Sequence, residues 1–270
     1  MKISFSTLGC PEWSWEDIVA TAKDFDYDGI EVRGIEKEIY VPKAKPFLPG
    51  ELDSTKKHLD ELGLAIPCIT SSCYLHIGEK HVHYIQEAKE YIDLAAKLNA
   101  PYIRVLGDAN PQPSENVNVK SVIAALKEIG EYAVPKNVTV LVETNGIFAN
   151  STRLKELMLA VNHEGVGVLW DIHHPYRFMN EPVKQTYNTL KEYIKHIHIK
   201  DSIVSEGKIK YKMMGQGDIP IKECLTLLKQ DDYQGFISLE WVKRWYTDLE
   251  EPGIVFMQFE NYIRDMWNGI

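Results

Sequence analysis

The sequence lacks any hydrophobic stretch long enough to cross a membrane. A spanning helix needs about 20 consecutive apolar residues, and charged or polar residues interrupt every apolar run of the chain well before that length. The opening segment, MKISFSTLGC, is too short and too polar for a secretory signal. We therefore expect a cytoplasmic protein with no membrane partner.

Positive charge and cysteine are also scarce. The chain has 30 Lys and Arg against 39 Asp and Glu, a net charge of −9. Such a surface repels phosphate backbones, and no basic patch interrupts it, so nucleic acid is not an expected partner. The four cysteines are widely spread and form no CxxC pair. We expect them to be free, buried thiols of a reducing compartment.

Short apolar strands alternate with segments of helical spacing along the whole chain. The predicted strands are ISFSTL (3–8), GIEVRG (29–34), AIPCITSS (65–72), YIRVLG (102–107), VTVLVETN (138–145), VGVLWDI (166–172), IKHIHIKD (194–201) and GFISLEW (235–241). Eight strands, each followed by a helix, are typical of a closed parallel barrel. An open doubly wound sheet would carry a Gly-rich turn after its first strand, and GCPEWSW lacks one. We predict an α/β fold, a single-domain (β/α)8 TIM barrel over residues 1–270.

The helical segments and the longer connections complete this prediction. Helices are expected over 14–25, with Ser14 as the N-cap, and over 83–98. Others are expected to begin near Ser54, Ser114, Ser151, Glu181, Ile219 and Asp248. The longest connections, YVPKAKPFLPG and SIVSEGKIKYKMMGQGD, follow the second and seventh strands. Both are expected at the end of the barrel where the strands finish, which is the catalytic end of this fold.

The last four strands each end with an inward-facing acid or imidazole. The acids are Glu143, Asp171 and Glu240, and the seventh strand, KHIHIKD, points His196, His198 and Lys200 to one face. A single Glu at a strand end usually marks a solvated rim, but repetition on four consecutive strands favours a site. Gathered carboxylates repel one another unless a cation lies among them. Three carboxylates and an imidazole suit Mn²⁺, Mg²⁺, Co²⁺ or Zn²⁺, of which we favour Mn²⁺.

The motifs VETN, DIHH, HIHIKD, GQGDIP and SLEW resemble the xylose isomerase-like barrel superfamily, which includes sugar phosphate isomerases and epimerases. The resemblance implies that one divalent metal ion is held by Glu143, Asp171, His198 and Glu240. His196, one step deeper, is then expected to be a hydrogen-bonded interior histidine. Several relatives have a histidine where this chain has Asn145, and the additional metal ligands of the endonuclease branch are absent.

The resemblance implies proton transfer next to a carbonyl. Metal-assisted removal of an α-proton by Glu143 or Glu240, and its return by the other, would epimerise or isomerise a sugar through an enediolate. The expected substrate-binding residues are His174, Lys200, Arg104, Glu31 and Gln216, with Arg33 and His76 as looser candidates; Trp13, Trp15 and Trp241 are better explained as core residues than as a sugar-stacking platform.

Two alternatives remain open at this point. If the enolate expels a β-hydroxyl, the protein is a metal-dependent dehydratase of the inosose or 3-dehydroshikimate type. If no proton moves, it is a non-catalytic sugar-binding barrel. The expected partner in each case is a sugar or polyol, non-phosphorylated by preference because no Gly-rich phosphate loop follows the last strands. A homodimer or homotetramer is compatible with the sequence.

Overall fold

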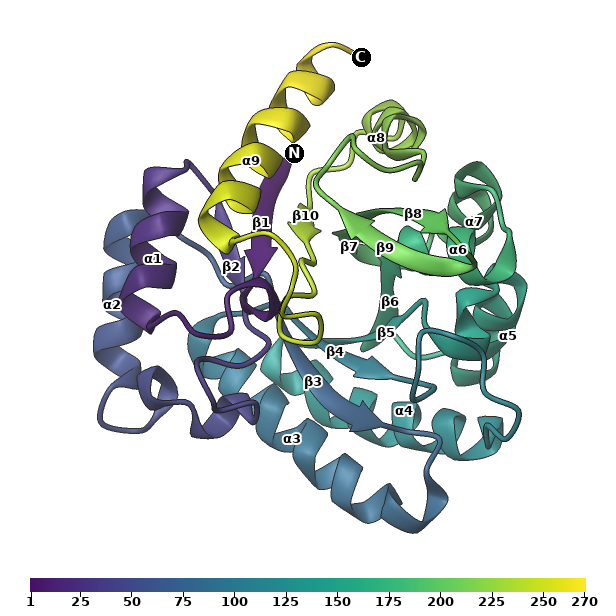
Figure 1. Cartoon of the computed structure of the whole chain (residues 1–270). Helices are drawn as coiled ribbons and strands as arrows, with labels where there is room; N and C mark the ends of the chain where they lie inside the picture. Colours follow the sequence, from purple (N-terminus) through teal and green to yellow (C-terminus); the bar gives the residue numbers. More distant parts are fainter.

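The computed structural model describes residues 1–270 and shows eight parallel strands closed into a barrel, with the helices around its outside (Figure 1). The strands are β1 Lys2–Ser6, β2 Gly29–Glu31, β3 Cys68–Tyr74, β4 Tyr102–Leu106, β5 Thr139–Glu143, β6 Val166–Asp171, β7 Ile194–Ile199 and β10 Phe236–Leu239. Their order is β2-β1-β10-β7-β6-β5-β4-β3. Parallel bridges at Gly29–Ala65 and Val32–Ile69 join β2 to β3 and close the barrel. The predicted (β/α)8 fold is confirmed.

The helices follow the predicted spacing with local shifts. They are α1 Trp15–Asp24, α2 Leu52–Leu62, α3 His81–Leu98, α4 Val119–Ala133, α5 Ser151–Val161, α6 His173–Met179, α7 Val183–Leu190, α8 Ile221–Gln230 and α9 Pro252–Asn268. Ser14 caps α1 in a reciprocal capping box with Asp17, as the sequence predicts. The fourth helix begins later than predicted, because Asn118 is its cap and the Ser114 hydroxyl bonds to Asp108 instead. None of these helices combines the length and apolar character needed to cross a bilayer.

The core lies between the barrel strands and the surrounding helices. Phe256 of α9 stacks on Phe5 of β1 with ring centroids 4.1 Å apart, and the Tyr27 hydroxyl donates to the Phe256 carbonyl at 2.7 Å. Trp241 is fully buried in this core, as expected. All the cysteines are free and buried. The long C-terminal helix therefore packs against the first strand and covers that side of the barrel.

Two elements stand at the catalytic end of the barrel, and one of them replaces a predicted long connection. The segment after β7 is an antiparallel hairpin, β8 Asp201–Ser205 and β9 Lys208–Lys212. Its two-residue turn, Glu206 and Gly207, has positive φ angles of 53° and 73°, the backbone that a tight hairpin turn requires. In the DIHH motif, Asp171 ends β6 and the two histidines, His173 and His174, begin α6. Both elements stand over the strand ends and border the site.

Candidate active site

The strand register brings the predicted acids and His198 together. Asp171 on β6 is paired with His198 on β7, which is paired with Ser238 on β10, two residues before Glu240. Glu143 ends β5, the neighbour of β6. One ligand atom from each of Glu143, Asp171, His198 and Glu240 lies within 4.8 Å of the others, and all four residues are buried. The quartet predicted from the strand ends is therefore a single cluster, which we call the quartet below.

Two cations neutralise the quartet acids. Lys200 Nζ contacts the Asp171 carboxylate and donates to Glu240 Oε2 at 2.6 Å. Arg104 Nε lies 3.1 Å from Glu143 Oε2, and Arg104 also donates to the Ser71 carbonyl at 2.8 Å. Both basic side chains are almost completely buried. Each quartet acid thus has a basic neighbour that fixes its orientation.

Burial and charge set opposite pKa shifts on the two glutamates. Burial raises the pKa of Glu143, and repulsion from Glu240 adds to this, against the lowering effect of Arg104. Burial acts in the same direction on Glu240, but the attraction of Lys200 and His198 is stronger and holds the pKa of Glu240 well below its usual value. Two carboxylates with pKa values pushed apart are typical of an acid–base pair.

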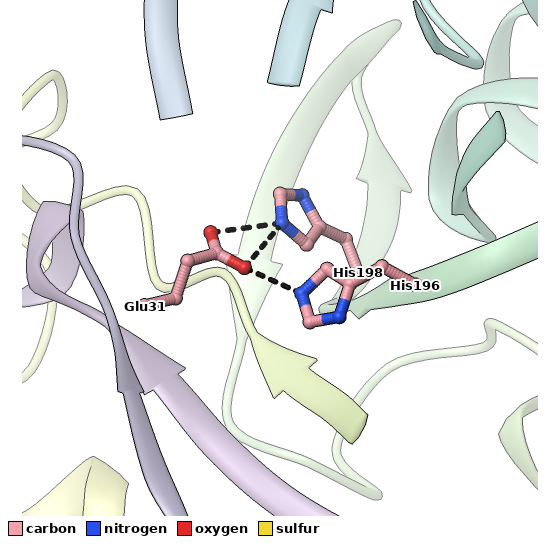
Figure 2. A group of neighbouring side chains, drawn as sticks. All are labelled: Glu31, His196 and His198. Carbon is pink, nitrogen blue, oxygen red and sulfur yellow. Dashed lines mark hydrogen bonds and ion pairs between the residues drawn. The ribbon is translucent and has the colours of Figure 1, made fainter. Parts of the chain in front are cut away.

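His198 is supported from below by a buried carboxylate (Figure 2). Glu31, on β2, reaches across the barrel and accepts from His196 Nε2 at 2.7 Å and from His198 Nε2 at 2.9 Å. All three side chains are fully buried. His198 Nδ1 has no hydrogen-bond partner and lies 3.4 Å from Glu240 Oε1. With its Nε2 proton donated to Glu31, His198 turns Nδ1 toward the quartet acids. Burial lowers the pKa of this ring, but Glu31 and Glu240 outweigh burial and raise it, so a bound metal ion would take the place of a proton on Nδ1.

His174, at the start of α6, also has a fixed orientation. Its Nδ1 lies 3.0 Å from the Thr144 carbonyl oxygen, which only accepts, so this nitrogen carries the proton. Nε2 is then an acceptor, 3.7 Å from Asp171 Oδ2. His174 therefore offers a lone pair beside the quartet that can take a proton from a substrate hydroxyl.

The quartet opens into a pocket of about 250 Å³. Pockets that hold drug-sized ligands have volumes of roughly 300–1,000 Å³, so this smaller pocket fits a smaller molecule such as a monosaccharide. Its wall includes the quartet glutamates, Arg33, Arg104, Lys200, His174, Asn145 and the aromatic residues Tyr74, Tyr211, Trp245 and Tyr246. A larger groove of about 790 Å³ lies between α1 and α2, and none of the clustered ligand groups found here lines it.

Among the predicted substrate-binding residues, three line this pocket and two do not. His174, Lys200 and Arg104 are on its wall. Glu31 lies beneath it with its carboxylate occupied by the two histidines, so its position is that of a support for His198. Gln216 is exposed and outside the pocket lining. The glycines around Gln216 instead wrap the Asp201 carboxylate, which accepts from the backbone N–H of Gly215 and Gly217.

Several pocket residues were not predicted from the sequence. Tyr211 comes from the β8–β9 hairpin and Trp245 and Tyr246 from the loop after β10, which carry no motif. Asp108, after β4, is fully buried and holds the loop under Asn145 by accepting from the N–H of Ile147 at 2.9 Å. The sequence feature that could have indicated Asp108 is the GDAN turn, because an aspartate in a turn commonly accepts hydrogen bonds from nearby backbone N–H groups.

The quartet has the chemistry of a divalent-metal site. Carboxylate oxygens and an imidazole nitrogen suit Mn²⁺, Mg²⁺, Co²⁺ or Zn²⁺. The buried and unpartnered Nδ1 of His198 is the independent sign, since a buried nitrogen without a partner is costly unless a ligand satisfies it. The residues present therefore fit a metal ion.

Comparison with known proteins places the chain among related barrels. The family model described as xylose isomerase-like TIM barrel matches residues 19–256. Fructoselysine 3-epimerase of Shigella flexneri is 23% identical over 96% of this chain and 95% of its own length. Among solved structures, an IOLI protein with a bound zinc atom has a TM-score of 0.82 at 18% identity, covering 100% of this chain and 99% of that one. The probable 3-DHS dehydratase AsbF of Bacillus anthracis has a TM-score of 0.80 at 19% identity, with 98% and 99% covered.

Proposed function

Because the chain belongs to the xylose isomerase-like TIM barrel family, we propose that it is a divalent-metal-dependent sugar epimerase or isomerase. The observation that carries this proposal is the buried quartet, in which three carboxylates and the free Nδ1 of His198 converge at the floor of a pocket of monosaccharide size. A relative that matches this chain over 95% of its own length is named an epimerase, which supports the proposed activity.

Glu143, Asp171, His198 and Glu240 would hold one metal ion, with Mn²⁺ favoured. When bound, the ion supplies Lewis-acid polarisation of a substrate carbonyl. A solved structure of the same fold contains a zinc atom. This agrees with a divalent ion in the quartet but does not identify the metal.

The chain's own residues would move the proton. Glu143 and Glu240 are the base and acid on the α-carbon: one removes the proton to give an enediolate, and the other returns a proton. Return to the opposite face of the same carbon gives epimerisation, and return to the adjacent carbon gives isomerisation. Lys200 contacts Glu240 and favours its ionised form, and Arg104 contacts Glu143 and orients it; both cations lie where they can stabilise the negative oxygens of the enediolate.

A dehydratase is the second candidate. One of the same acids would remove the α-proton, and the enediolate would then expel a β-hydroxyl, which leaves as water with a proton from a protonated carboxyl group, Glu143 or Glu240. The specific observation in its favour is the equally good structural match to a probable 3-DHS dehydratase. A non-catalytic sugar-binding barrel is disfavoured by the complete set of ligand and proton-transfer residues.

Solvent-deuterium incorporation tests the proposal. The metal-loaded protein is incubated in deuterated water with a panel of ketoses and keto-polyols, and the products are analysed by mass spectrometry and NMR. We expect deuterium at the α-carbon, with the substrate mass otherwise unchanged. A product lighter by one water would establish the dehydratase instead. Tight binding with no exchange in any substrate would leave only the binding protein.

The role of Glu31 gives a separate prediction about metal affinity. In Glu31→Gln the side-chain amide still accepts from one histidine but donates toward the other, so His198 no longer keeps its Nδ1 lone pair free in every molecule. We expect metal affinity to fall by about 10–100-fold, measured by competition with a chromophoric chelator. The matched control is Glu181→Gln, a buried glutamate that bonds Ser151 and Thr186 outside the pocket. Equal affinities in the two variants would show that Glu31 does not position the ligand.

A further inference from the structure

Arg33 is a buried cation on the pocket wall that has no acidic partner. It follows β2, is only 6% exposed and lines the pocket. Its Nη2 donates to the Ser72 hydroxyl at 2.6 Å, while Nη1 is buried with no hydrogen-bond partner. No carboxylate lies within ion-pair distance of it anywhere in residues 1–270. Burial, reinforced by repulsion from Arg104, lowers the pKa of Arg33, which shows how poorly its charge is compensated.

The other two basic side chains on the wall each have an acidic partner within the protein. Arg104 pairs with Glu143, and Lys200 pairs with Asp171 and Glu240. A buried charge that is left unpaired is strongly unfavourable, so an unpaired arginine in a ligand pocket indicates a charge that arrives with the ligand. Neutral sugar hydroxyls would not need this arrangement.

The backbone around Arg33 is held firmly, so the side chain is positioned and not adventitious. The Arg33 N–H donates to the Thr7 hydroxyl at 2.8 Å, and that hydroxyl donates to the Gly34 carbonyl at 2.6 Å. The guanidinium carbon lies 6.0 Å from the ring centroid of Trp245, at the limit for a cation–π contact. The aromatic ring leaves the hydrogen-bonding edges of the guanidinium available.

Arg33 is separated from the quartet along the rim of the barrel. In the closed order of strands, β2 is four positions from β6, three from β5 and β7, and two from β10, and these four strands carry the quartet. The pocket joins the two sides, since Glu143, Glu240 and Arg33 all line it. A substrate whose reacting carbonyl lies at the quartet would therefore extend its far end toward Arg33.

We propose that the substrate carries an anionic group, a carboxylate or a phosphate, at the end remote from its reacting carbonyl, and that Arg33 binds this group. The inference rests on the proposed function, because the quartet defines which end of the substrate reacts. It narrows the substrate class from sugars in general to acidic sugars. Guanidinium is suited to both oxyanions, which it can bind through two parallel hydrogen bonds.

The charges around the site agree with a single negative charge on the substrate. Four carboxylates outnumber three basic side chains by one when the histidines are counted as neutral; the groups are Glu31, Glu143, Asp171, Glu240, Arg33, Arg104 and Lys200. A bound divalent ion changes this balance from −1 to +1. One carboxylate on the substrate would bring the filled site to neutrality, which a neutral sugar would not do.

Three ligands with one ketose skeleton test the proposal: D-fructose, D-fructuronate and D-fructose 6-phosphate, which differ only at the carbon farthest along the chain. Binding to the Mn²⁺-loaded protein is measured by calorimetry in wild type, Arg33→Met and the control Arg264→Met. Arg264 bonds Asp26 and Glu260 on the outside of the barrel. We expect an anionic ligand to bind about 10–100-fold more tightly than fructose, as one charge-assisted contact provides. Arg33→Met should abolish that preference and Arg264→Met should keep it.

The two anions identify the source of the charge. Preference for fructuronate over the phosphate ester assigns a carboxylate, and the reverse assigns a phosphate; both support the role of Arg33. Equal binding of all three ligands, no binding by either anion, or an anion preference that survives in Arg33→Met would overturn the proposal. Deuterium exchange with neutral ketoses but without anion preference would leave the proposed function intact. Arg33-dependent anion binding without exchange would instead contradict the function and not the inference.

Discussion

Replacing His198 by alanine and Glu240 by glutamine in one chain is expected to abolish metal binding. These changes remove the imidazole ligand and one anionic oxygen donor from a quartet whose atoms lie within 4.8 Å of one another. Loss of an outer partner alone costs about 10–100-fold in metal affinity, so loss of the imidazole ligand together with the charge of one carboxylate ligand should exceed roughly 10³-fold. Elemental mass spectrometry should find about one divalent ion per wild-type chain and almost none in the double variant.

A surface histidine–glutamate pair provides the matched control for this experiment. His163 Nε2 lies 3.3 Å from Glu131 Oε1, and the Glu131 side chain is largely exposed. His163→Ala with Glu131→Gln makes the same two chemical changes outside the site and should keep wild-type metal content. Circular dichroism must show the barrel in both variants. Full metal content in the His198 and Glu240 variant would disprove the quartet as the metal site, and a metal-free wild type after soaking with Mn²⁺, Co²⁺ and Zn²⁺ would remove the Lewis acid from the proposed chemistry.

The barrel could be predicted because its information is local and repeated. Each strand is an apolar run bounded by turn residues, and parallel strands must all end at one side of the barrel. This rule predicts that Glu143, Asp171, Glu240 and the histidines of the seventh strand lie together, and the resemblance to the xylose isomerase-like superfamily selects His198 as the fourth member of the set. The β8–β9 hairpin was missed although its signal was present: residues 202–212 alternate about a Glu206–Gly207 turn. A long connection is predicted there because a (β/α)8 barrel has a helix, and not a hairpin, between consecutive strands.

Other parts of the site depend on contacts across the barrel, which sequence spacing does not encode. Glu31 lies on the second strand and His198 on the seventh in the barrel series, and only the closed barrel shows that their side chains meet. The position of Glu31 near a strand end predicts a contact with substrate, whereas its buried carboxylate accepts hydrogen bonds from His196 and His198. The lack of an acidic partner for Arg33 likewise cannot be predicted from the sequence, because it depends on which side chains lie beside Arg33 in the folded barrel.

Single substitutions of Glu143 and Glu240 should separate the two directions of proton transfer. Each glutamate has its own cation, Arg104 for Glu143 and Lys200 for Glu240, and each extends from a different strand end. If they act on opposite faces of a planar enediolate, Glu143→Gln and Glu240→Gln should each reduce epimerisation by about 10²–10⁴-fold. Glutamine keeps the shape and one oxygen donor, so metal content at saturating Mn²⁺ should persist and is measured in parallel.

Deuterium exchange then distinguishes two bases from one. With two bases, each variant still exchanges the α-proton of the epimer that faces its remaining carboxylate, and the two variants retain exchange with opposite epimers. Glu181→Gln, a buried change outside the pocket, should exchange both epimers at the wild-type rate. Loss of exchange from both epimers in one variant, with normal exchange in the other, would mean that a single carboxylate serves both faces. The opposite pKa shifts of Glu143 and Glu240 would then reflect only their cations and burial, and the second glutamate would be a metal ligand without a proton to transfer.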